Sequence, residues 1–94
     1  MTAIEAARIA SVEGAQLVRQ RKGQPDQYDV KPLFTGNHRG WTILDGYSAS
    51  AICAVYDAIS ADRQIAYGIL PLVTMADIAF RVIAKHQEKR QPTN

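Results

Sequence analysis

The sequence is poor in the residues on which disulfide-rich and metal-binding proteins depend. Its 94 residues include one cysteine, Cys53, and two histidines, His38 and His86. A single cysteine excludes an intramolecular disulfide and any cysteine-only metal site. Neither histidine has a second histidine or cysteine at ligand spacing, so we expect no metal and no cofactor. The scarcity of cysteine fits a reducing compartment, and the cytoplasm is the expected location.

Long uncharged hydrophobic stretches are also missing. Residues 1–18 are rich in apolar side chains, but Glu5, Arg8 and Glu13 interrupt them. A membrane helix needs about 20 consecutive apolar residues, and a signal peptide needs an uncharged apolar core, so the sequence predicts neither. With 47% hydrophobic and 21% charged residues, the composition is typical of a folded protein. The length predicts a single globular domain, residues 1–94.

The first helix signal stands at the start of the chain. Thr2 and Glu5 have the spacing of a capping box, in which each side chain binds a free backbone N–H group at the start of a helix. We expect a helix from about residue 3 to residue 22. Basic residues at its end suit the helix dipole, and Gly23 suits a C-terminal cap.

Three further helices are predicted in the second half of the chain. Ser48 or Ser50 is expected to cap the second helix, and Ser60 the third. Pro71 suits the first turn of a fourth helix that runs to about Lys89. The polar tail, residues 90–94, is expected to fray.

The helical period disappears between residues 24 and 46. Pro25 and Pro32 oppose a helix, whereas β-favouring residues occur near 28–34 and 41–44. This pattern predicts an extended segment or a short antiparallel β-hairpin, with the proline-containing strand at an edge. The expected fold class is therefore mainly α: one small domain of about four helices, with this segment between the first helix and the second.

The middle segment also holds the residues that we expect to bind a partner protein. They are aromatic or basic and are expected on a loop: Tyr28, Phe34, His38, Arg39 and Trp41. Aromatic and arginine side chains anchor many protein interfaces, and loops on a rigid scaffold often carry binding residues. The alternative for the glycine-flanked His38-Arg39 pair is the tip of a turn with incidental charge.

Nucleic-acid binding is the alternative function that the sequence leaves open. Its candidate residues are basic and lie near the end of the first predicted helix and along the last: Arg19, Arg21, Lys22, Arg81, Lys85 and Lys89. A small nucleic-acid-binding regulator would need these groups to converge on one face. The residues on the last helix also fit a solvated face, on which Asp77 pairs with Arg81.

No group of residues predicts catalysis. Cys53 has no recognisable base near it, and no combination of nucleophile, base and stabilising group is evident. We therefore expect a non-enzymatic protein with no catalytic residues. The apolar faces of the first two helices fit packing within one chain or across the twofold axis of a homodimer, and both arrangements stay open.

Three stretches carry a resemblance: WTILDG from residue 41, AVYDAIS from residue 54 and LPLVTMADIAF from residue 70. Over residues 41–83 the chain resembles small helical proteins of unassigned function that are encoded by actinobacterial phages. The resemblance implies no catalytic residue. It implies an interaction module that binds and modulates a host protein, in the cytoplasm of the host cell.

Overall fold

The structure of the chain is a computed structural model that describes the backbone of residues 1–90 and the side chains of residues 1–87. Its elements, in chain order, are α1 (Ala3–Glu13), β1 (Gln16–Arg21), β2 (Gln24–Pro32), β3 (Thr42–Leu44), α2 (Gly46–Ala58), α3 (Ala61–Gly68) and α4 (Leu72–Arg90). The four predicted helices are confirmed. The three-stranded sheet means that "mainly α" describes only part of the fold.

The first helix is much shorter than predicted. Thr2 and Glu5 form the expected capping box, with the Glu5 N–H donating to the Thr2 hydroxyl at 3.3 Å. The helix ends at Glu13 because Gly14 follows with φ of +92°, a conformation that side chains with a Cβ atom disfavour. The prediction of helix through residue 22 was wrong, and Gln16–Arg21 instead form a strand.

The sheet has the order β2-β1-β3 and both of its strand pairs are antiparallel. In β1, Val18 lies opposite Val30 of β2, and Leu17 lies opposite Ile43 of β3. Of the two alternatives for this segment, the hairpin between the parts near 28–34 and 41–44 is wrong, because β1 lies between them. The extended alternative agrees with the strands β2 and β3. The expected edge position of the proline-containing strand β2 is confirmed.

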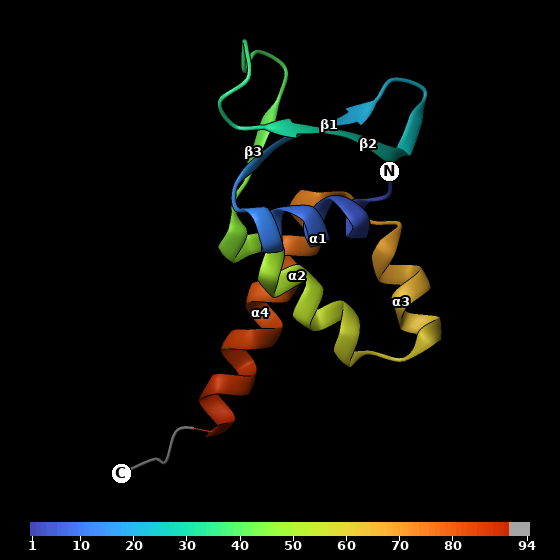
Figure 1. Cartoon of the computed structure of the whole chain (residues 1–94). Helices are drawn as coiled ribbons and strands as arrows, with labels where there is room; N and C mark the ends of the chain where they lie inside the picture. Colours follow the sequence, from blue (N-terminus) through green and yellow to red (C-terminus); the bar gives the residue numbers. More distant parts are fainter. Residues whose placement is uncertain (91–94) are drawn as a thin grey trace.

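The helices lie on one face of the sheet (Figure 1). α1 runs directly beneath the strands, with α2 on its other side, and α4 extends away from the sheet. α1 buries a row of alanines: Ala3, Ala6, Ala7 and Ala10. A Cβ atom added to Gly46 would lie 3.4 Å from the carbonyl oxygen of Ala10, so small residues on both helices permit this close packing.

The remaining helix starts agree with the predictions in part. Ser60 caps α3 as expected, with its hydroxyl accepting from Arg63 N–H at 3.4 Å. α2 is capped by Asp45, not by Ser48 or Ser50; the Asp45 carboxylate accepts from Ser48 N–H at 2.6 Å. Pro71 precedes α4, which ends at Arg90.

Residues 91–94 of the predicted tail lie outside the described part of the chain. Within the described part, no helix combines the length and the apolar character that crossing a bilayer requires.

Candidate binding site

Four of the five predicted partner-binding residues lie on the connecting loop, residues 33–41, which leads from β2 to β3. The side chain of Phe34 is 95% exposed, although phenylalanine is among the residue types that are most often buried. His38 and Arg39 are also exposed, and Trp41 is half-buried. The connecting loop therefore presents a large aromatic ring to solvent.

Hydrogen bonds within the connecting loop and to its flanks fix its shape. At its start, the N–H and the hydroxyl of Thr35 both donate to the Pro32 carbonyl, at 3.2 and 2.7 Å. In its middle, Nε2 of His38 lies 2.8 Å from the Leu33 carbonyl oxygen. Three more bonds join Lys31 Nζ to the Asn37 carbonyl, Arg39 N–H to the Asn37 side chain, and Trp41 N–H to the His38 carbonyl. Loops without such bonds pay more entropy when they bind.

Trp41 is held between the connecting loop and the sheet by two cations. Cζ of Arg19 lies 4.3 Å from the centroid of the Trp41 ring, and Nζ of Lys31 lies 4.4 Å from it. Both distances are well inside the range of cation–π attraction. Trp41 therefore fixes the end of the connecting loop against basic side chains of β1 and β2.

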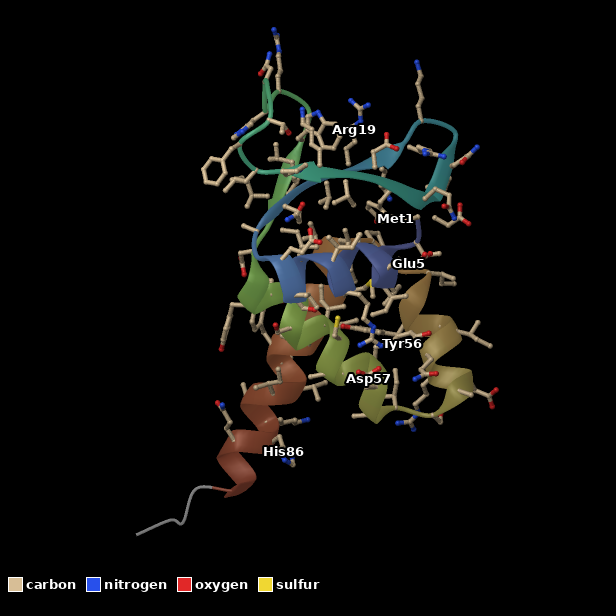
Figure 2. The ribbon with its side chains drawn as sticks, in the orientation of Figure 1. Met1, Glu5, Arg19, Tyr56, Asp57 and His86 are labelled. Atoms are coloured by element: carbon tan, nitrogen blue, oxygen red, sulfur yellow. The ribbon has the colours of Figure 1, made fainter. Side chains whose placement is uncertain are left out.

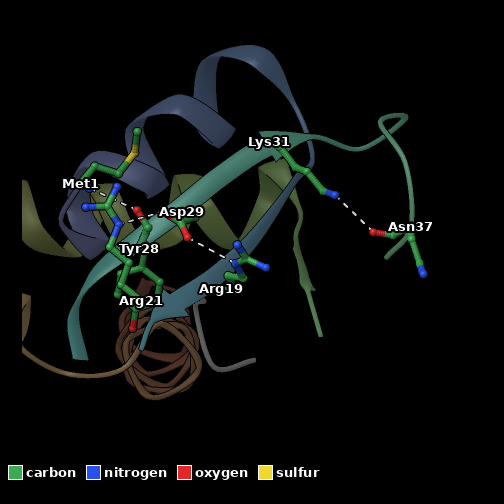
Figure 3. A network of polar contacts seen from close by, with 7 residues as sticks. All are labelled: Met1, Arg19, Arg21, Tyr28, Asp29, Lys31 and Asn37. Atoms are coloured by element: carbon green, nitrogen blue, oxygen red, sulfur yellow. Dashed lines mark hydrogen bonds and ion pairs between the residues drawn. The ribbon is translucent and has the colours of Figure 1, made fainter. Parts of the chain in front are cut away.

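The face of the sheet that points away from α1, here called the outer face, is basic. Strand alternation places Arg19, Arg21, Asp29 and Lys31 on it. Nε of Arg19 and Nε of Arg21 both donate to the Asp29 carboxylate, at 3.3 and 2.9 Å (Figure 3). The hydrogen bond from Arg21, followed by that from Arg19, holds the pKa of Asp29 below its ordinary value.

Positive charge is concentrated at the end of the molecule that contains the sheet. Residues 16–44 contain five basic and two acidic residues, a net charge of +3, whereas the whole chain carries +2 and the rest of it therefore −1. Figure 2 shows Arg19 on the side of the sheet away from α1, and His86 near the far end of α4. An anionic partner is favoured at the sheet end.

Tyr28, the fifth predicted partner-binding residue, is 5% exposed and belongs to the core. Its hydroxyl accepts a hydrogen bond from the backbone N–H of Leu72 at 3.2 Å and another from Nε2 of Gln20 at 3.4 Å. Tyr28 thus joins the sheet to the start of α4 and does not face a partner.

The basic residues proposed for nucleic-acid binding do not converge. Arg19, Arg21 and Lys22 lie in β1 and the turn after it, whereas Arg81 and Lys85 lie in the second half of α4, close in sequence to His86, which Figure 2 shows far from the sheet. Arg81 pairs with Asp77 at 3.1 Å, as expected for a solvated face. The side chain of Lys89 lies outside the described residues.

A trough beside β3 was missed by the sequence analysis. It consists of two adjoining hollows with volumes of about 290 and 160 Å³. Both are lined by two residues of the sheet and two residues at the start of α4: Val18, Thr42, Leu72 and Val73. Val73 is 73% exposed and Ile43 is 55% exposed. The sequence does not show that these apolar residues are exposed or that they lie close together. The trough therefore becomes evident only in the structure.

The described residues hold no group of three or more histidine, cysteine, aspartate or glutamate side chains that is arranged to bind a metal. Cys53 is buried in the core. A third hollow of about 410 Å³ lies between α2 and α4, with Val55, Ile59 and Val82 among its lining residues. Comparison with known proteins finds no matching family model, curated protein or solved structure.

Proposed function

We propose that the protein is a non-enzymatic interaction module that binds a partner protein through its connecting loop. Phe34 is the anchor in this proposal, and Arg39 and Trp41 belong to the same loop. The observation that carries the proposal is the 95% exposure of the Phe34 side chain on a loop of fixed shape. Complete burial of a phenylalanine side chain stabilises a complex by about 1.5–3 kcal/mol, which is enough for one residue to act as an interface anchor.

The fixed shape of the loop supports a binding role. Association costs free energy when loops and side chains must be ordered. Thr35, His38 and Trp41 already hold the loop through hydrogen bonds to Pro32, Leu33 and one another. Little further ordering is needed when a partner covers Phe34.

The resemblance of residues 41–83 to small phage proteins makes a bacterial host protein the partner that we expect. In this view the protein acts in the host cytoplasm, where it binds and modulates its target. The single buried cysteine, Cys53, is compatible with a reducing compartment.

Capture from a host lysate tests the proposal. The tagged chain, a Phe34→Ala variant and an Ile65→Ala variant are compared, each with and without nuclease treatment. Ile65 is 70% exposed on α3 and provides a matched surface control. We expect one protein to be captured in stoichiometric amount by the wild type and by Ile65→Ala, and to be lost with Phe34→Ala. Equal capture by all three forms would reject the anchor role of Phe34.

Nucleic-acid binding by the outer face is the second candidate function, and the net charge of +3 over residues 16–44 supports it. This version uses Arg19, Arg21 and Lys22 without the basic residues of α4. It predicts captured material that disappears on nuclease treatment, and an affinity that falls steeply as salt rises.

A further inference from the structure

The two edges of the sheet differ in how well they are protected. On β2, the backbone nitrogen of Met1 donates to the Tyr28 carbonyl at 3.1 Å, and the Tyr28 N–H donates to the Met1 carbonyl at 2.7 Å (Figure 3). Pro25 and Pro32 further interrupt that edge. Backbone pairing and prolines are devices that stop an edge strand from binding another strand.

The β3 edge has none of these devices. Its residues, Thr42–Leu44, include no proline and no charge. They pair with Gln16–Val18 of β1 on one side. Across the described residues, no further hydrogen bond reaches the backbone of Thr42–Leu44 from the other side. An edge strand of this kind is a template for pairing with another extended chain.

The trough lies beside this open edge. One of its walls is β3 and the other is the first turn of α4, where Leu72 and Val73 stand. The smaller hollow continues past β3 to Ser48 and Ala76, and the larger reaches Arg19 and Gly40. A segment paired with β3 would therefore place alternate side chains in an apolar recess.

We propose that the trough binds an extended segment of a partner protein, which adds to the sheet as a strand beside β3. This inference rests on the proposed interaction function and names the kind of segment recognised. Main-chain hydrogen bonds to β3 would supply affinity, and the recess would select the side chains that point inward. The inward positions call for apolar residues because Val18, Leu72 and Val73 line the recess.

The positive charge of the sheet end determines which residues suit the outward positions of the bound segment. In an added strand, the side chains between the inward ones point to the outer face, where the cationic groups of Arg19 and Lys31 lie against Trp41, the residue before β3. Arg19 also lines the larger hollow. Acidic residues at the outward positions would be attracted by these cations. The expected segment therefore alternates apolar and acidic residues.

The charge of the sheet end and the apolar lining of the trough argue against two other occupants. A second copy paired through β3 would bring two ends of charge +3 together, which costs free energy. A nucleic acid would have to place phosphates or polar base edges against the apolar walls of the trough, where Val18, Leu72 and Val73 stand.

The test uses a synthetic peptide of alternating valine and glutamate with blocked ends. Two control peptides are used: one has the same composition with valines and glutamates in separate blocks, and the other alternates valine and lysine. Binding is measured by calorimetry, and amide hydrogen exchange is followed at Thr42, Ile43 and Leu44. We expect saturable binding of the alternating acidic peptide alone, with slower exchange of outward-facing β3 amides.

Two exposed valines provide the matched variants. Val73→Glu places a carboxylate in the wall of the trough, whereas Val12→Glu makes the same change on α1, where Val12 is 85% exposed. We expect Val73→Glu to weaken peptide binding by about tenfold or more, a change of about 1.4 kcal/mol, and Val12→Glu to leave it unchanged. Both positions are exposed, so folding of both variants is expected and is checked by circular dichroism.

Several outcomes would overturn the inference. These are no binding of the alternating acidic peptide, equal binding of the block peptide, or equal effects of the two variants. A dimer that Val73→Glu dissociates would identify a second copy as the occupant, and a single-stranded oligonucleotide that competes for β3 would identify a nucleic acid. If the wild-type protein does not bind the peptide but still captures a host protein through Phe34, the role of the trough is rejected and the proposed function is retained.

Discussion

The hydroxyl of Tyr28 accepts a hydrogen bond from the backbone N–H of Leu72, 44 residues further along the chain. Leu72 is the first residue of α4, and the first N–H groups of a helix have no partner within the helix. A side chain of the sheet therefore supplies the partner that a local capping residue would otherwise provide. The sheet and α4 are joined at this buried point.

Tyr28→Phe should destabilise the fold. The substitution keeps the ring but leaves the buried Leu72 N–H without its acceptor, a loss that typically costs about 1–3 kcal/mol. Tyr47→Phe is the control, because Tyr47 is 75% exposed. Urea denaturation followed by circular dichroism measures both variants. Equal midpoints for the two would show that the Tyr28 hydrogen bond contributes nothing to stability.

Asp45→Ala should also reduce stability, through the start of α2. The Asp45 carboxylate accepts from both the N–H and the hydroxyl of Ser48, and loss of an N-cap typically costs about 1 kcal/mol. Ser50→Ala should have little effect, since Ser50 is exposed and does not cap the helix. Thermal or urea unfolding of the two variants provides the comparison, and a larger effect for Ser50→Ala would contradict the assignment of the cap.

Tyr67 should make the fold sensitive to alkaline pH. Burial raises its pKa to about 12, and its hydroxyl donates to the Met75 carbonyl at 2.7 Å. In the unfolded chain a tyrosine ionises near pH 10. The contribution of Tyr67 is therefore complete below about pH 10 and is lost as the pH rises toward about 12.

Unfolding curves across this alkaline range check the prediction with wild-type protein and Tyr67→Phe. The variant should be less stable at neutral pH, because the Met75 carbonyl loses its donor, but its stability should fall less as the pH rises. Parallel falls in the two proteins would exclude Tyr67 as a source of the alkaline sensitivity.

The ion pair between Arg8 and Asp57 should contribute to stability by an amount that depends on salt concentration and pH. Two N–H groups of the Arg8 guanidinium donate to the Asp57 carboxylate and link α1 to α2. These bonds, more than simple charge attraction, hold the pKa of Asp57 below its ordinary value. The pair's contribution is thus present above the ordinary aspartate pKa and is lost as the pH falls through the lowered value.

A double-mutant cycle with Arg8→Gln and Asp57→Asn measures this coupling. We expect a small favourable coupling at neutral pH and low salt, because both side chains are about half exposed, 46% and 56%. The coupling should shrink at high salt and vanish in strong acid. Coupling that is unchanged by either condition would show that the pair acts through packing rather than charge.

Local signals predicted the features that depend on neighbouring residues. The capping box at Thr2, the cap at Ser60 and the start of the last helix after Pro71 each involve groups within a few residues of one another. These parts of the fold could be predicted because their physical causes lie close together in the sequence.

Features that depend on distant residues could not be predicted in this way. The stretch Gln16–Arg21 carries an apolar pair followed by basic residues, which suits either the end of a helix or a strand. Its strand conformation is set by pairing with β2 and β3. The burial of Tyr28 likewise depends on Leu72. The place of β1 between β2 and β3, the two segments that were expected to pair, also depends on residues that are distant in the sequence.

The hydrogen bonds of the connecting loop run almost wholly between its own residues and those just before it, such as Lys31 and Pro32. Its conformation therefore owes little to the helices. We expect that the segment from β2 to β3 can be replaced by a loop of different sequence without loss of the helical layer. In evolutionary terms, the sequence of this loop can vary freely, while the alanine row of α1 tolerates almost no enlargement.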